Sequence, residues 1–174
     1  MRFAAQTAAK ARRTRRAEPV ILFTVSGETF AIAAEAVQEI RSTDGLAGAA
    51  VEFEQSEVPK VRHTIERARR TYYVVSAAKH FGLRLTRPTL VLILRQLRSA
   101  VLVDRIEGMA EIAAVHPLPR AFTGEERNWY RGLAYLHDAV VPVVRPSGFL
   151  TAEEFLRLDQ AWKAVESREE AYSA

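Results

Sequence analysis

Short apolar runs separated by turn-forming residues constrain the fold of this chain more than any other feature. Residues 20–25 and 29–33 flank Ser26-Gly27-Glu28, a turn of the length that joins two antiparallel strands. Residues 71–75 form a further run, residues 89–95 and 100–109 form a second hairpin, and residues 130–146 give two strands that turn at His137-Asp138. No strand–helix–strand alternation is present, so the pattern predicts a mainly β protein, a barrel or a sandwich.

The segments between these runs are less regular. Residues 34–40 bring Val37 and Ile40 to one face at a spacing of three, as a short helix or a bent segment would. Residues 42–60 have little periodicity and predict a long loop. Thr151 with Glu154 forms a capping box, and an apolar stripe follows, so residues 151–174 predict a C-terminal amphipathic helix. The stripe consists of Phe155, Leu158, Trp162 and Val165.

Charge is distributed unevenly along the 174 residues. Residues 1–17 contain six basic side chains and no acid, whereas the remaining chain has 19 basic and 21 acidic side chains. This segment lacks the apolar block of a secretory signal. We expect residues 1–19 to be a basic arm, either disordered or nascent-helical. The arm is either a solvated start or a segment that contacts nucleic acid or anionic lipid.

Signatures of catalysis and of metal binding are missing from the sequence. The chain has no cysteine, no phosphate-binding loop, no dinucleotide-binding glycine motif and no HExxH zinc motif, and its four histidines are scattered. We therefore expect no catalytic residue, no metal site and no cofactor. No run approaches the ~18 apolar residues of a membrane span. The absence of cysteine fits a reducing cytoplasm, which is the expected location.

Three blocks of the sequence resemble, in the correct order, the CheW-like domain, the coupling module of bacterial chemotaxis arrays. They are residues 21–41 with "VQEIR", residues 89–112 with a "VD" followed by "EGM", and residues 130–144 with "YRGLAYL". The resemblance covers residues 20–150. It implies two intertwined SH3-like five-stranded barrels around a shared core and no enzymatic activity.

The same resemblance implies a function and a set of contact residues. A member of this family binds the regulatory domain of a CheA-type histidine kinase on one surface and the tips of methyl-accepting chemoreceptors on another. Such a protein works in the cytoplasm, at membrane-associated receptor arrays. "VQEIR" matches the receptor-contacting groove of the family, which makes Val37, Glu39, Ile40 and Arg41 candidate contacts. The alternative for Val37 and Ile40 is that both lie in the core.

One block departs from the family pattern. Where typical members have Asn-Leu-Arg-Gly, this chain has Glu66-Arg67-Ala68-Arg69, which lacks the glycine that eases a tight turn. Five basic residues surround Glu66 here, and we expect them to form a modified partner interface for an acidic target, with Arg67, Arg69 and Arg70 as its contacts. A solvated turn is the alternative. The five are Lys60, Arg62, Arg67, Arg69 and Arg70.

Two functional hypotheses follow from these patterns. The first is a non-enzymatic adaptor that couples chemoreceptors to a kinase by protein–protein contacts. The alternative is a stand-alone β-barrel binding module that uses its basic N-terminal arm on nucleic acid or another anionic surface.

Overall fold

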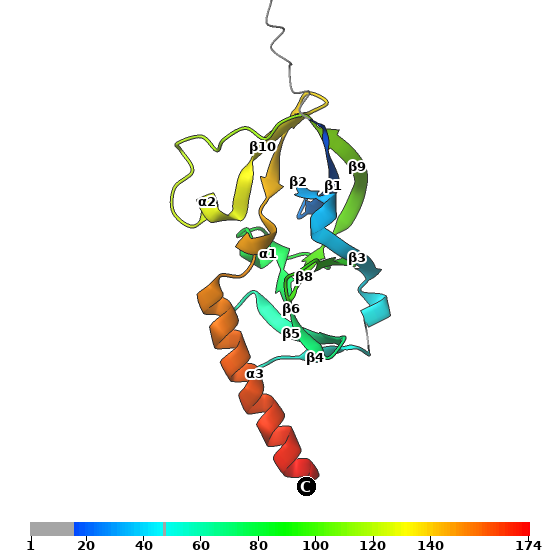
Figure 1. Cartoon of the computed structure of the whole chain (residues 1–174), viewed down its shortest axis with the longest axis vertical. Helices are drawn as coiled ribbons and strands as arrows, with labels where there is room; N and C mark the ends of the chain where they lie inside the picture. Colours follow the sequence, from blue (N-terminus) through cyan, green and yellow to red (C-terminus); the bar gives the residue numbers. More distant parts are fainter. Residues whose placement is uncertain (1–15, 47) are drawn as a thin grey trace, which may run out of the picture.

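The computed structural model describes residues 16–46 and 48–174, and these fold into two sheets and a long C-terminal helix (Figure 1). Residues 1–15 of the expected basic arm lie outside the described residues, whereas Glu18 and Pro19, which the expected arm included, belong to the first strand. The first sheet has the strand order β10-β11-β2-β1-β9, and the second has the order β3-β7-β8-β6-β5-β4. Neighbouring strands are antiparallel except for the pairs β11–β2 and β6–β8, which are parallel.

The strands are short, as the turn spacing predicts. Those of the first sheet are β1 (Glu18–Val25), β2 (Glu28–Ala33), β9 (Arg105–Ile112), β10 (Tyr130–Leu136) and β11 (Ala139–Val144). Those of the second are β3 (Val37–Ser42), β4 (Ala50–Glu52), β5 (Val61–Arg67), β6 (Arg70–Ser76), β7 (Leu90–Leu94) and β8 (Ser99–Val103).

The helices are α1 (Ala77–His80), α2 (Glu126–Trp129) and α3 (Ala152–Ser173), with 3-10 turns η1 (Ala34–Ala36), η2 (Asp44–Leu46) and η3 (Pro146–Gly148).

The path of the chain interleaves the two sheets. Strands β1 and β2 open the first sheet, β3 to β8 then build the whole second sheet, and β9 to β11 return to complete the first. This arrangement confirms the predicted mainly β fold with a C-terminal helix. The second sheet has six strands where five were expected, because β4 pairs with β5 inside the predicted loop 42–60. All three β4 residues are exposed, so this edge strand has no apolar alternation by which to recognise it.

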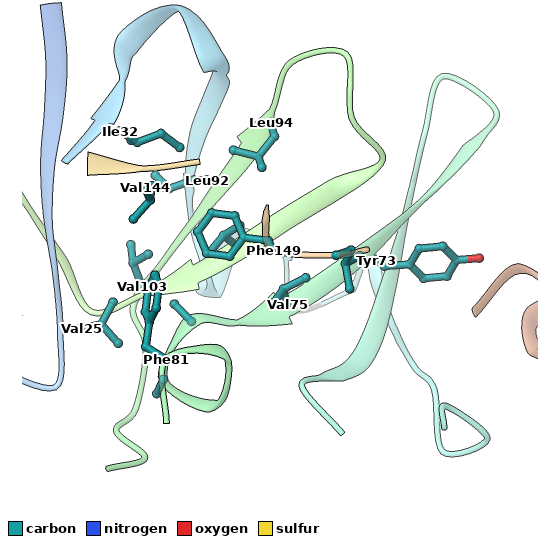
Figure 2. Close-up of a cluster of buried hydrophobic side chains, with 14 of the residues drawn as sticks. Val25, Ile32, Tyr73, Val75, Phe81, Leu92, Leu94, Val103, Val144 and Phe149 are labelled. Atoms are coloured by element: carbon teal, nitrogen blue, oxygen red, sulfur yellow. The ribbon is translucent and has the colours of Figure 1, made fainter. Parts of the chain in front are cut away.

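Successive side chains of the strands point alternately into two different apolar clusters. In β7, Val91 and Ile93 point into a cluster formed by the second sheet with Leu46 of η2, which we call the second-sheet cluster, whereas Leu92 and Leu94 point into a shared core. The shared core (Figure 2) also takes residues from the first sheet, among them Phe23 and Ile32. A third cluster lies in the interior of the first sheet and includes Val20, Ala31 and Val143. Each sheet therefore has its own interior, and both cover one common core.

The same alternation places the tyrosines of β6 on opposite faces. Tyr72 and Val74 belong to the second-sheet cluster, and Tyr73 and Val75 belong to the shared core. The hydroxyl of Tyr73 reaches the rim of the core and donates to Asp159 in α3 at 2.5 Å. Burial and this hydrogen bond raise the pKa of Tyr73. Burial also raises the pKa of Asp159, but hydrogen bonds from Arg98 and Tyr73 outweigh it, so that pKa lies below its ordinary value.

Helix α3 begins with the predicted capping box, in which Thr151 and Glu154 satisfy each other's backbone N–H groups. Its stripe faces the shared core, with Leu158 buried and Phe155, Trp162 and Val165 packed against it. In Figure 1 the helix, coloured orange to red, runs from the junction of the sheets along the second sheet to the C-terminus. The last element is therefore attached mainly to the second sheet and the core.

His80 is buried inside an aromatic cluster. Its ring lies 4.9 Å from the ring centroids of Phe81, Trp129 and Phe149. Its Nδ1 lies 3.2 Å from Nζ of Lys60, so the neutral imidazole accepts a hydrogen bond from that ammonium. Burial, with the nearby charge of Lys60, lowers the pKa of His80 from 6.5 to about 3.

This depressed pKa predicts a pH dependence of stability. The unfolded chain takes up a proton near pH 6.5 and the folded chain does not, so His80 contributes its full stability above pH 6.5 and loses it as the pH falls toward 3. The free energy of unfolding in urea should fall by up to about 1.4 kcal/mol per pH unit below pH 6.5. His80→Phe should flatten this slope between pH 6.5 and 5, above the range of most carboxylates. The exposed His63→Gln serves as the control and should keep it. An equal slope in wild type and His80→Phe would contradict the assignment.

Candidate functional site

Glu39 binds two arginines at one edge of the second sheet. Its Oε1 lies 3.0 Å from Nε of Arg41, and its Oε2 lies 2.7 Å from Nη2 of Arg67. The Arg67 side chain is 24% exposed, and its Nη1 is buried without a hydrogen-bond partner among the described residues. We call Glu39, Arg41 and Arg67 the Glu39 network. It joins the "VQEIR" block to the block that replaces Asn-Leu-Arg-Gly, the two segments expected to contact partners.

A β-bulge positions the "VQEIR" residues. In the pairing of β3 with β7, Val37 is opposite Leu94 but Glu39 is already opposite Ile93, so one extra residue is inserted in β3. Beyond the bulge, Glu39 and Arg41 pair with Ile93 and Val91, residues that face the second-sheet cluster.

Arg67 lies on the same side of the sheet because side chains alternate between the two faces of a regular strand. It lies two residues after Ile65, which also faces the second-sheet cluster. Strands β3 and β5 are not neighbours in the sheet, so the ion pair from Arg67 to Glu39 crosses from one edge strand to the strand next to the other edge.

Val37 and Ile40 share a side of β3 but differ in burial. Val37 pairs with Leu94 and Ile40 pairs with Leu92, and both of these partners face the shared core. Val37 and Ile40 are three residues apart, and the extra residue of the bulge places them on the same face of β3. Val37 is 7% exposed and belongs to the shared core, whereas Ile40 is 41% exposed. The expectation that Val37 contacts a partner is therefore corrected to a core position, because its side chain faces Leu94. Ile40 remains as an apolar residue at the edge.

The turn between β5 and β6 has an unusual backbone for its sequence. Arg67 pairs with Arg70, and the two residues between them, Ala68 and Arg69, have φ of 47° and 62°. Two successive residues at positive φ form a type I′ turn, which normally uses asparagine and glycine. The chain keeps the tight turn without the family's glycine and accepts the strain of a left-handed backbone at two side-chain-bearing residues.

The five basic residues around Glu66 do not form one free cluster. Lys60 pairs with Glu154 of α3 at 3.2 Å, and Arg67 pairs with Glu39. Arg62, Arg69 and Arg70 are exposed. The predicted single basic interface is therefore divided by the fold: one arginine supports the Glu39 network, one lysine fastens α3, and Arg69 with Arg70 lie at the tip of the hairpin.

Other residues in the recognisable motifs have structural roles. Gly132 in "YRGLAYL" has φ of 156°, and a Cβ there would lie 2.1 Å from the backbone oxygen of His116. The Asp104 carboxylate accepts hydrogen bonds from the backbone N–H of Ser26 at 2.6 Å and from the hydroxyl of Thr86, which ties the first hairpin to the end of β8. His137 and Asp138 form the predicted turn, with φ of 44° and 65°.

The described part of the chain has neither a cluster of metal ligands nor a membrane-spanning helix. Within residues 16–46 and 48–174, no three His, Cys, Asp or Glu side chains gather as metal ligands. No helix in these ranges is long and apolar enough to cross a membrane.

The strained hairpin generates a stability prediction. Replacing Ala68-Arg69 with Asn-Gly should raise the free energy of unfolding by about 1 kcal/mol, because Asn and Gly adopt positive φ at lower cost. Chemical denaturation measures the change. Arg70→Ser is the control for charge, since it removes an arginine without altering the two turn residues. A double variant no more stable than wild type would show that the turn is unstrained.

Comparisons with known proteins agree with this geometry. The model of the CheW-like domain matches residues 19–154. The fold is similar to the crystal structure of the scaffolding protein TtCheW from Thermoanaerobacter tengcongensis, with a TM-score of 0.62 and 16% sequence identity, over 74% of this chain and 89% of that one. No curated protein matches the chain. Because the family match covers most of the sequence and the fold agrees with it, the chain belongs to the CheW-like domain family.

Proposed function

We propose that this protein couples the tips of methyl-accepting chemoreceptors to the regulatory domain of a CheA-type histidine kinase, with the Glu39 network as a contact for one of these partners. The family is one of non-enzymatic scaffold proteins of chemotaxis, which gives the general role. The observation that carries the finer proposal is the ion pair between Glu39 and Arg67. It brings together two blocks, far apart in the sequence, that the family resemblance marks separately as contact segments.

The chemistry around the network suits a protein partner. Ile40 offers an exposed apolar anchor on the same strand, and Arg69 and Arg70 place positive charge at the tip of the neighbouring hairpin. Protein interfaces combine such apolar anchors with a charged rim that favours the correct partner. The Glu39 carboxylate is already held by two arginines, so little side-chain freedom is lost on binding. A partner that meets this edge encounters a fixed pattern of charge.

A charge swap separates a binding role from a structural one. Glu39→Arg alone should lower the free energy of unfolding by about 1–2 kcal/mol, because Arg67 is half-buried and loses its partner. The double variant Glu39→Arg with Arg67→Glu restores the attraction with reversed polarity and should regain most of that stability. We expect it to lose co-sedimentation with receptor and kinase, because the partner meets the opposite charges. Thermal unfolding and co-sedimentation are measured on the same samples.

The matched control is the ion pair of Glu18 with Arg131 on the first sheet, which has similar exposure and a distance of 2.8 Å. Swapping its charges should leave partner binding unchanged. If the swapped Glu39 and Arg67 variant is folded and binds receptor and kinase as wild type does, the pair serves the fold alone and the proposal is wrong.

A further inference from the structure

Helix α3 is attached to the rest of the molecule by a narrow stripe. Leu158 is its one fully buried residue among those described, at 1% exposed. Trp162 meets the ring of Phe53 edge-on at 5.1 Å between centroids, and Phe155 lies tilted against Tyr73 at 6.2 Å. Every residue from 166 to 174 is exposed. The helix is long, but little of it is buried.

The polar contacts of α3 are partly open to water. Asp159 accepts hydrogen bonds from both Nη atoms of Arg98, at 2.9 and 2.7 Å, and from the Tyr73 hydroxyl. The side chains of Arg98 and Asp159 are 27% and 33% exposed, and those of Lys60 and Glu154 are 15% and 26% exposed. Ion pairs that water and salt reach add little to stability. The polar contacts therefore determine where the helix docks but contribute little to the free energy that keeps it docked.

The surface under the helix has its own support. We call Phe53, Tyr73 and Arg98 the α3 seat. The N–H of Tyr73 donates to the backbone oxygen of Arg98 at 2.9 Å, and the N–H of Phe53 donates to that of Arg62 at 2.8 Å. These bonds belong to the second sheet and its connections and do not involve α3. The seat therefore keeps its backbone when the helix leaves, and presents two aromatic rings beside a guanidinium group.

We propose that the α3 seat is a docking site for an amphipathic helix of a partner protein, and that α3 is a displaceable strap that competes for it. The spacing of Phe155, Leu158 and Trp162 defines the partner's chemistry: apolar residues at i, i+3 and i+7. A carboxylate at i+4, the place of Asp159, pairs with Arg98. The proposal goes beyond the coupling role and holds whichever partner the Glu39 network binds. Segments with few buried contacts open locally while the rest stays folded, which gives α3 its freedom to leave.

The first test uses a fluorescent peptide of residues 151–174 as the helix in trans. Wild-type protein should bind it weakly, because α3 occupies the seat in most molecules. A full-length chain with Leu158→Ala and Asp159→Asn, which weaken the strap, should bind it roughly tenfold more tightly, since the fraction of open seats rises. Arg157→Gln, on the exposed side of α3, is the matched control and should bind as wild type does. Equal affinity of the weakened and wild-type chains would overturn the proposal.

A second pair of measurements checks the position of the peptide and its competitor. A chain with Arg98→Glu should prefer a peptide that carries Asp159→Lys over the unmodified peptide, and absence of this preference would place binding elsewhere. Sedimentation should show that the weakened chain stays monomeric when alone. If it dimerises by exchange of α3, the occupant is a second copy of this chain, contrary to the proposal.

Hydrogen exchange of the wild-type protein needs no substitution. Amides of α3 between residues 156 and 165 should exchange at least roughly tenfold faster than those of β6 and β8, because the helix opens without the sheet. If α3 exchanges only as slowly as β6 and β8, it opens with the whole molecule and is not a displaceable strap.

Discussion

One apolar core, shared by both sheets, is the constraint on which the rest of the structure depends. Strands such as β1 and β7 bury both faces: one face lies in the interior of the strand's own sheet, and the other packs against the other sheet in the shared core. This is why segments such as "LVLIL" read as continuous apolar runs and not as alternating ones. Because Leu92 and Phe23 pack in the same cluster, neither sheet is complete without its neighbour.

The shared core also explains how an adaptor can hold its contact residues in place. Strand β3 is an edge strand, yet Val37 anchors its start in the shared core, and the bulge that follows turns Glu39 and Arg41 to the opposite side. Arg67 meets them from a hairpin that places Ile65, Tyr72 and Val74 in the second-sheet cluster. The Glu39 network thus lies on strands of the sheet, whereas α3 places one fully buried residue, Leu158, in the core and is otherwise held at its rim. The contact edge is firm and the helix is looser because the two bury different amounts of surface in the shared core.

Strong local signals account for what the sequence predicts correctly. Hairpin turns, β-branched runs and the capping box at Thr151 act within a few residues, and these elements formed where expected. Strand β4 was missed because three exposed residues carry no pattern. The Glu39–Arg67 pair was not predicted as a contact, since no local rule connects β3 to the end of β5. Lys60 was predicted to belong to the basic cluster, but it pairs with Glu154, which lies on a helix far along the chain. Ion pairs between distant segments form only when the chain is folded, and the fold depends on the shared core.

Through this core, the two sheets should unfold as one cooperative unit. Hydrogen exchange of a Leu92→Ala variant tests it most directly, because Leu92 lies on β7 of the second sheet and points into the shared core. The substitution removes about 2–5 kcal/mol of stability. Slowly exchanging amides of β1 and β2 in the first sheet should then lose as much protection as those of β8 beside Leu92. Loss of protection confined to the second sheet, with β1 and β2 unchanged, would contradict it.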